Sequence, residues 1–150
     1  MAESKQQSVL IINGPNLNLL GLREPSVYGT RSYSDLLDYV NQSAAELGIE
    51  VELLQSNHEG VIIDAIQSAL GRVDGIVINA AGYTHTSVAI LDALKAVGLP
   101  AVEVHLSEPL AREDFRRLSY VGMACEKRFA GRGFEGYRLA LEYLKECLGA

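Results

Sequence analysis

The chain has 150 residues, 48% hydrophobic and 21% charged, which is typical of one globular domain with a sizeable core. Its net charge of −6 argues against a nucleic-acid partner, because phosphate binding needs a basic surface. No apolar run is long enough to cross a bilayer, and Met1 to Ser8 lacks the apolar stretch of a secretory signal. We therefore expect a cytoplasmic protein without a membrane partner, formed by one domain over residues 1–150 with a flexible N-terminus at 1–7. Cys125 and Cys147 form no Cys-x-x-Cys pair, so neither a disulfide framework nor a zinc site is predicted.

Short β-branched runs alternate with longer amphipathic stretches along the chain. After a first strand at 8–13, a helix is predicted at 32–47, with Ser32 or Ser34 placed to cap its start and Gly48 at its end. The other strands are expected at 49–55, 74–79, 101–106 and 125–129, and the other helices at 59–70, 86–97 and 136–148. This alternation predicts an α/β fold of the flavodoxin-like type, a five-stranded parallel sheet with helices on both faces.

The segment "NGPNLNLLGLREPSVYG", residues 13–29, follows the first strand directly. It is far longer than a turn, and a long structureless connection inside a small domain is usually functional or disordered. Its four leucines argue against disorder, because a solvated tail would not carry so many apolar side chains. The segment is therefore predicted to be a functional loop.

In open parallel sheets, ligands bind at the carboxyl ends of the strands. The polar side chains that follow the predicted strands are Asn16, Arg23 and Tyr28; Asn57 and His58; Asn79, Thr84 and His85; and Glu103, His105 and Ser107. This set contains all three histidines of the chain. Their concentration after strand ends predicts an active site there.

Sequence motifs for bound cofactors are missing from this region. The first strand is followed by neither Gly-x-Gly-x-x-Gly nor a phosphate-binding loop, and no Gly-x-Ser-x-Gly elbow is present. His85 and His105 could ligate a metal, but asparagine and arginine neighbours are poor support for a cation. All four lysines lie outside the collected set, which argues against a Schiff base. We therefore expect acid–base chemistry without a cofactor or metal.

Tyr28 and His105 are the candidate proton-transfer pair. A phenol is protonated at neutral pH, so a base needs a nearby cation. One guanidinium at about 4 Å supplies on the order of 4 kcal/mol at an effective dielectric of about 20, so Arg23 on the same loop suffices in principle. Glu103, two residues before His105 on one face of a strand, would orient the imidazole and hold it protonated.

Each candidate also has an ordinary structural interpretation when taken alone. Loop tyrosines often pack, strand-end histidines are often hydrogen-bonded, and Asp92 resembles a solvent-facing helical acid. Six arginines lie in the last forty residues, and part of this cluster could bind a small anion. A solvated helix face is the simpler interpretation for four members of this cluster, Arg117, Arg128, Arg132 and Arg138.

Five motifs, "GPNLNLLGLREPSVYG", "QSNHEG", "YTHTSVAILDAL", "VEVHLS" and "AREDFRRLSY", resemble those of the type II 3-dehydroquinate dehydratases, in the same order. The match runs from Val9 to about Leu144. It implies cofactor-free, reversible dehydration of 3-dehydroquinate to 3-dehydroshikimate, which serves aromatic amino-acid biosynthesis through the shikimate pathway or quinate breakdown. It also implies a homo-oligomer, a dodecamer built from four trimers.

The resemblance also implies roles for individual residues. Tyr28 would remove a proton to give an enolate, His105 would protonate the departing hydroxyl, and Arg23 would hold the phenolate. Asn16 would position a water, Glu103 would orient His105, and the loop would close as a lid. Asn79, His85 and Arg116 would bind substrate hydroxyls, and the Leu106 and Ser107 backbone would bind the carboxylate. Arg112 would close over the site, and Asp92 would enter it from a neighbouring subunit.

The chain departs from the family pattern at three places. Leu91 stands where the family usually has arginine, and Glu108, Pro109 and Leu110 replace a common Asn-x-His. The stretch "CEKRFAGRGFEGY" is more charged than usual. Two alternatives remain open: a flavodoxin-like nucleotide-binding or electron-transfer module, and a catalytically weakened paralogue with an assembly or regulatory role.

Overall fold

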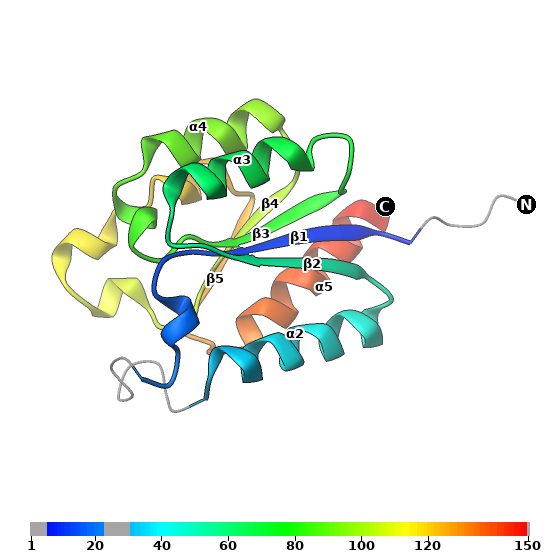
Figure 1. Cartoon of the computed structure of the whole chain (residues 1–150), viewed down its shortest axis with the longest axis horizontal. Helices are drawn as coiled ribbons and strands as arrows, with labels where there is room; N and C mark the ends of the chain where they lie inside the picture. The colour runs from blue at the N-terminus through cyan, green and yellow to red at the C-terminus, as the bar shows by residue number, and fades with distance from the viewer. Residues whose placement is uncertain (1–5, 23–30, 150) are drawn as a thin grey trace, which may run out of the picture.

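A five-stranded parallel sheet forms the centre of the structure, a computed structural model that describes residues 6–22 and 31–149 (Figure 1). The strand order is β2-β1-β3-β4-β5, and all neighbouring strands are parallel. The bounds are β1 Ser8–Asn13, β2 Glu50–Gln55, β3 Gly75–Asn79, β4 Ala101–His105 and β5 Lys127–Ala130. The flavodoxin-like architecture predicted from the sequence is confirmed. Strands β1, β3 and β4 lie inside the sheet, which explains their near-continuous burial.

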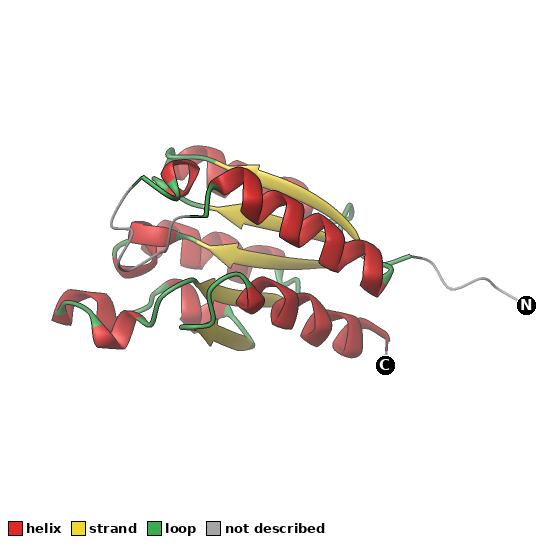
Figure 2. Ribbon diagram, turned by 90° about the horizontal axis from the view of Figure 1, so that it is seen from below, coloured by secondary structure: helices red, strands yellow, loops and turns green. Residues whose placement is uncertain are grey.

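Two layers of helices cover the sheet. Helices α2 (Tyr33–Leu47) and α5 (Glu135–Gly149) pack on one face, and α3 (Glu59–Ala69) and α4 (Val88–Val97) pack on the other (Figures 1 and 2). Each layer encloses its own hydrophobic core, because alternate residues of a strand point to opposite faces. Leu10 of β1 packs toward α3 and α4, for example, and Ile11 packs toward α2 and α5.

The helix ends follow the chemistry expected from the sequence. Ser32 caps α2 in a reciprocal capping box with Asp35, and Gly48 ends this helix at a φ of 71°. The helix predicted at 86–97 starts two residues later, at Val88. A 3₁₀ helix, η2 (Ala81–His85), comes first, and the Ser87 side chain then accepts the Ile90 N–H.

The fifth strand also begins two residues later than predicted. The 3₁₀ helix η5 (Val121–Ala124) precedes β5 and ends at Cys125, so strand pairing starts at Lys127. Pairing of β5 with β4 sets Arg128 directly opposite Glu103. Three further 3₁₀ helices, η1 (Leu17–Leu19), η3 (Pro109–Ala111) and η4 (Asp114–Arg117), lie beyond the carboxyl ends of the strands (Figure 1).

Within residues 6–22 and 31–149, no helix has the length and apolar character to span a membrane. Cys125 and Cys147 are both free thiols. Cys125 is partly buried, and this burial raises the pKa of its thiol to about 12, so the thiol is neutral at physiological pH.

Candidate active site

A cavity of about 250 Å³ opens at the carboxyl ends of β1, β3 and β4. Most of the side chains singled out from the sequence line it, although they come from four separate segments. Those lining residues are Asn16, Asn79, His85, His105, Leu106, Ser107, Arg112 and Arg116. The other walls are Pro15, Leu17, Leu19, Leu20, Ala81, Gly82 and Pro109. Polar groups thus converge on a partly apolar cavity, the usual form of a small-molecule site.

The loop after β1 is anchored closely to the loop after β3. The Gly14 N–H donates to the Asn79 carbonyl at 2.8 Å, and a Cβ at Gly14 would lie only 2.4 Å from the Ala80 carbonyl oxygen. Asn16 adopts a left-handed conformation with φ 71°, and its N–H donates to Asn57 Oδ1 at 3.0 Å. These contacts bring Asn16 to the cavity wall.

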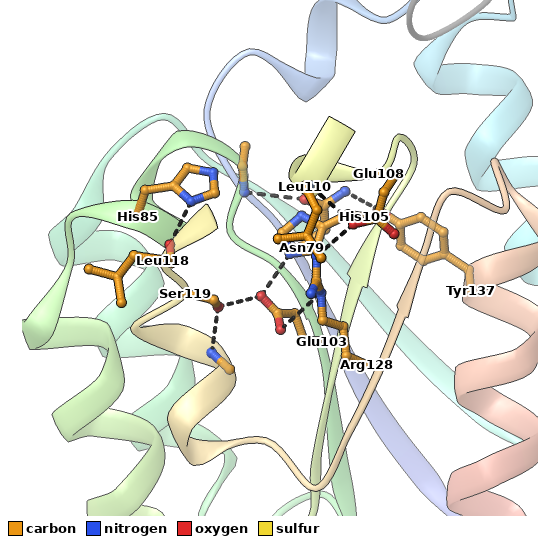
Figure 3. Close-up of polar contacts among 12 residues, drawn as sticks. Asn79, His85, Glu103, His105, Glu108, Leu110, Leu118, Ser119, Arg128 and Tyr137 are labelled. Carbon is orange, nitrogen blue, oxygen red and sulfur yellow. Dashed lines mark hydrogen bonds and ion pairs between the residues drawn. The ribbon is translucent and has the colours of Figure 1, made fainter. Parts of the chain in front are cut away.

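Glu103 and His105 form a buried pair at the end of β4 (Figure 3). The two side chains lie on the same face of the strand, and His105 Nε2 is 2.7 Å from Glu103 Oε2. Ser119 Oγ donates to the same carboxylate oxygen at 2.6 Å and itself accepts the Gly122 N–H at 2.8 Å. The carboxylate therefore orients the imidazole through Nε2, and Nδ1 is not part of this contact.

The environment of Glu103 favours its ionised form. Burial by itself raises the pKa of this carboxyl, but hydrogen bonds from His105 and Ser119 and the charge of Arg128 together lower it below its ordinary value. A negative carboxylate behind His105 stabilises a positive charge on the imidazole. This is the electrostatic arrangement that a general acid requires.

His85, at the end of η2, also lines the cavity and has a different electrostatic environment. Its Nδ1 is 2.8 Å from the Leu118 carbonyl oxygen (Figure 3). Burial lowers the pKa of His85, and nearby His105 and Arg116 lower it further. The neutral imidazole donates from Nδ1 to Leu118 and keeps Nε2 as an acceptor for a hydroxyl group.

Asn79 is held by a second buried cluster that contains no charge. Its Nδ2 donates to the Tyr137 hydroxyl at 3.1 Å, and this hydroxyl donates to Asn13 Oδ1 at 2.6 Å. Asn79 Oδ1 accepts the Ala81 N–H at 3.2 Å. The carboxamide thus has a single orientation at the cavity wall. Burial raises the pKa of Tyr137 far above its ordinary value, so this phenol is a donor and not a base.

Two arginines give the rim of the cavity a positive charge. Arg116, on η4, pairs with Glu113 at 2.5 Å, and Arg112 lies at the end of η3. Both line the cavity together with Ser107. A carboxylate or a polyhydroxylated ligand would fit this combination of guanidinium and hydroxyl donors.

Residues 7–145 match the family model described as "Dehydroquinase class II".

The chain belongs to the class II dehydroquinase family.

Similar proteins agree with this assignment. A 3-dehydroquinate dehydratase of Corynebacterium glutamicum is 54% identical over 136 residues, 91% of this chain and 94% of the relative. The same-named protein of Caldicellulosiruptor bescii is 53% identical over 143 residues, 95% and 99% of the two chains. The crystal structure of a type II dehydroquinase from Butyrivibrio crossotus superposes with a TM-score of 0.91 at 46% identity, covering 93% of this chain and 97% of that one.

Some predicted site residues do not line the cavity in the described structure. Asp92 is exposed on α4, and His58 is exposed at the start of α3, so the three histidines do not converge as their positions suggested. Arg23 and Tyr28 lie outside the described residues. Among the residues described, no group of three histidine, cysteine or acidic side chains is placed to hold a metal ion.

Three polar residues contribute to the site that the sequence pattern does not mark individually. Ser119 falls inside the last of the five motifs, and Tyr137 lies in the predicted final helix. Arg128 was interpreted as part of a solvated helix face, and this is wrong, because it lies on β5 with Nε 3.7 Å from Glu103 Oε1. The sequence signals for it are two separate features, an unusually charged stretch around position 128 and the acidic Glu108 after Ser107.

Proposed function

We propose that the chain is a hydro-lyase that reversibly converts 3-dehydroquinate to 3-dehydroshikimate through an enolate, without a Schiff base. A phenolate removes the proton from the carbon next to the ketone, and the electron pair delocalises as an enolate. The enolate then collapses to a carbon–carbon double bond and expels the hydroxyl of the neighbouring carbon. That hydroxyl takes up a proton and leaves as water.

His105 supplies the proton to the leaving hydroxyl. The single observation that carries this assignment is the buried Glu103–His105 pair at the cavity, with Nε2 bound to the carboxylate. Nδ1 is the donating atom, and the carboxylate stabilises the imidazolium before transfer. Asn16, at the cavity wall, holds the water that stabilises the enolate oxygen.

Tyr28 is the base and Arg23 stabilises its phenolate. These two assignments come from the family motif "LREPSVYG" and from the need of a phenolate for a nearby cation. The supporting structural point is that the other tyrosine next to the site, Tyr137, is fully buried and protonated and cannot take this role.

Substrate hydroxyls are bound by Asn79, His85 and Arg116, and the substrate carboxylate by the Leu106 and Ser107 backbone, with Arg112 closing over the site. All six residues line the cavity. Asp92 enters the site of a neighbouring subunit, which would explain an acid exposed on α4. The assembly is a dodecamer of four trimers, which light scattering of the purified protein tests directly.

An absorbance assay tests the reaction. Purified protein is mixed with 3-dehydroquinate, and the conjugated enone product is followed in the ultraviolet. A rise that persists with chelator and after borohydride treatment in the presence of substrate supports cofactor-free chemistry without a lysine adduct. No rise from correctly folded protein would overturn the proposal.

The Tyr28→Phe variant tests the base. We expect turnover to fall by about 10²–10⁴, the usual contribution of proton transfer, while substrate binding measured by calorimetry survives. Tyr39→Phe is the matched control, because Tyr39 packs against Phe134 through its ring and loses only a hydroxyl. Near-normal turnover in Tyr28→Phe would contradict the assignment.

A further inference from the structure

Arg128 lies behind the catalytic pair, on the edge strand β5. It is paired in register with Glu103 of β4, and its Nε is 3.7 Å from Glu103 Oε1 (Figure 3). The Arg128 side chain is 34% exposed, whereas that of Glu103 is 1% exposed. The guanidinium therefore extends from the protein surface to a carboxylate that is inaccessible to solvent.

The two oxygens of Glu103 have different surroundings. Oε2 is bound by His105 and Ser119, whereas Oε1 is buried and accepts no hydrogen bond from the residues the structure describes. A buried carboxylate oxygen without compensation is costly. The positive charge of Arg128 lies beside this oxygen and offsets the cost of its burial by electrostatic attraction.

The other titratable groups around Glu103 do not replace that charge. His105 is on its own strand, His85 is on η2 and Cys125 follows η5. Burial lowers the pKa of His85 and raises that of Cys125, so both favour their neutral forms. Arg128 is the permanent cation of this group.

Glu108 fixes the position of Arg128. Its Oε1 lies 3.3 Å from Arg128 Nη2 and accepts the Leu110 N–H at 3.1 Å, which caps η3 at the cavity rim. Glu108, Arg128, Glu103 and His105 thus form a continuous series of side-chain contacts (Figure 3). This series links two departures from the family pattern, the acidic residue after Ser107 and the charged stretch around β5.

We propose that Arg128, held by Glu108, is a positioning residue that keeps the Glu103 carboxylate in place behind His105. This inference rests on the proposed function, because it assigns His105 as the acid. Arg128 is not among the residues that line the cavity, so it acts through Glu103.

Arg128→Met tests this role, with Arg128→Lys as the charge-retaining variant and Arg132→Met as the control. Arg132 is exposed and pairs only loosely with Glu135, at 3.6 Å. We expect Arg128→Met to lower kcat about tenfold, a part of the 10²–10⁴ of a general acid, with KM nearly unchanged. The loss should be greatest on the acidic side of the pH–rate profile and largely restored in Arg128→Lys. Kinetics matching those of Arg132→Met would overturn the inference.

A titration independent of activity separates this inference from the proposed function. Infrared difference spectra follow the protonated carboxyl band of Glu103, assigned by its loss in Glu103→Gln. In Arg128→Met this band should appear at a higher pH than in the wild-type chain and in Arg132→Met, because the positive charge of Arg128 lowers the pKa of Glu103. An unchanged titration would overturn the role of Arg128 even in an active enzyme, whereas a shifted titration in an inactive one would reject only the proposed function.

A double-mutant cycle tests the contribution of Glu108. Glu108→Gln keeps an oxygen acceptor for Leu110 but removes the charge that holds Arg128. Glu108→Gln should change kcat in the wild-type background but not in Arg128→Met, because coupled residues act non-additively. Equal effects in both backgrounds would show that Glu108 does not act through Arg128.

Discussion

Two buried polar clusters meet at the carboxyl ends of the strands, and they differ in charge. The neutral cluster, Asn13, Tyr137 and Asn79, lies between the sheet and α5, with the Tyr137 hydroxyl both donating and accepting. The charged cluster, Glu103, His105, Ser119 and Arg128, keeps one carboxylate oxygen without a hydrogen bond from the described residues.

Because the two clusters differ in charge, we expect one to stabilise the fold and the other to act in the reaction. A satisfied neutral cluster holds a side chain such as Asn79 in one orientation and gains little from a change of protonation. A charged cluster is costly to bury, but it sets the proton affinity of the group that it surrounds. We therefore expect mutations in the neutral cluster to affect mainly stability and mutations in the charged cluster to affect mainly turnover.

The largest effect is expected from His105→Asn, which removes the proposed acid. Turnover should fall by about 10²–10⁴, and thermal unfolding measured alongside shows that the variant is folded. His58→Asn is the control, because His58 is exposed at the start of α3 and asparagine also suits a helix cap. Comparable steady-state kinetics for the two variants would contradict the expectation that the charged cluster determines turnover.

The next effect is expected from Tyr137→Phe in the neutral cluster. The change leaves Asn79 Nδ2 and Asn13 Oδ1 without their buried partner, which should cost about 1–3 kcal/mol in the free energy of unfolding. Denaturant unfolding measures this cost, and turnover should change less than tenfold. Tyr143→Phe is the control on the same helix: Tyr143 is only partly buried and its hydroxyl makes a long, exposed hydrogen bond to Glu126 at 3.3 Å, so this change should cost less. A larger loss of turnover than of stability would place the neutral cluster in the chemistry.

The smallest effect is expected in the pH dependence of stability. The folded-state pKa of Glu103 is lowered from 4.5, so its stabilising contribution is present above about pH 4.5 and is lost as the pH falls through the folded value. The stability difference between the wild-type chain and Glu103→Gln should therefore shrink below pH 4.5. Unfolding curves between about pH 3 and pH 7 measure it. A stability difference that is constant over this range would mean that Glu103 has the same pKa in the folded and unfolded states.

The strands and helices were largely predictable, because their signals are local. Strand β1 ends where predicted, and α2 begins after Ser32 and ends at Gly48 as its capping residues indicated. The starts of α4 and β5 were each placed two residues early. In both cases a short 3₁₀ helix comes before the element, and such helices have little periodicity for a sequence to reveal.

The sequence by itself determined which residues follow the strand ends, since apolar runs and turn residues mark those ends. It thereby placed Asn16, Asn79, His85 and His105 at one edge of a parallel sheet. The tertiary structure alone decided which side chains meet. The register of β5 against β4 sets Arg128 opposite Glu103, and packing of α5 brings Tyr137 to Asn13 across 124 positions of the chain. Such contacts depend on strand register and layer packing, which arise from the whole core and not from any local pattern.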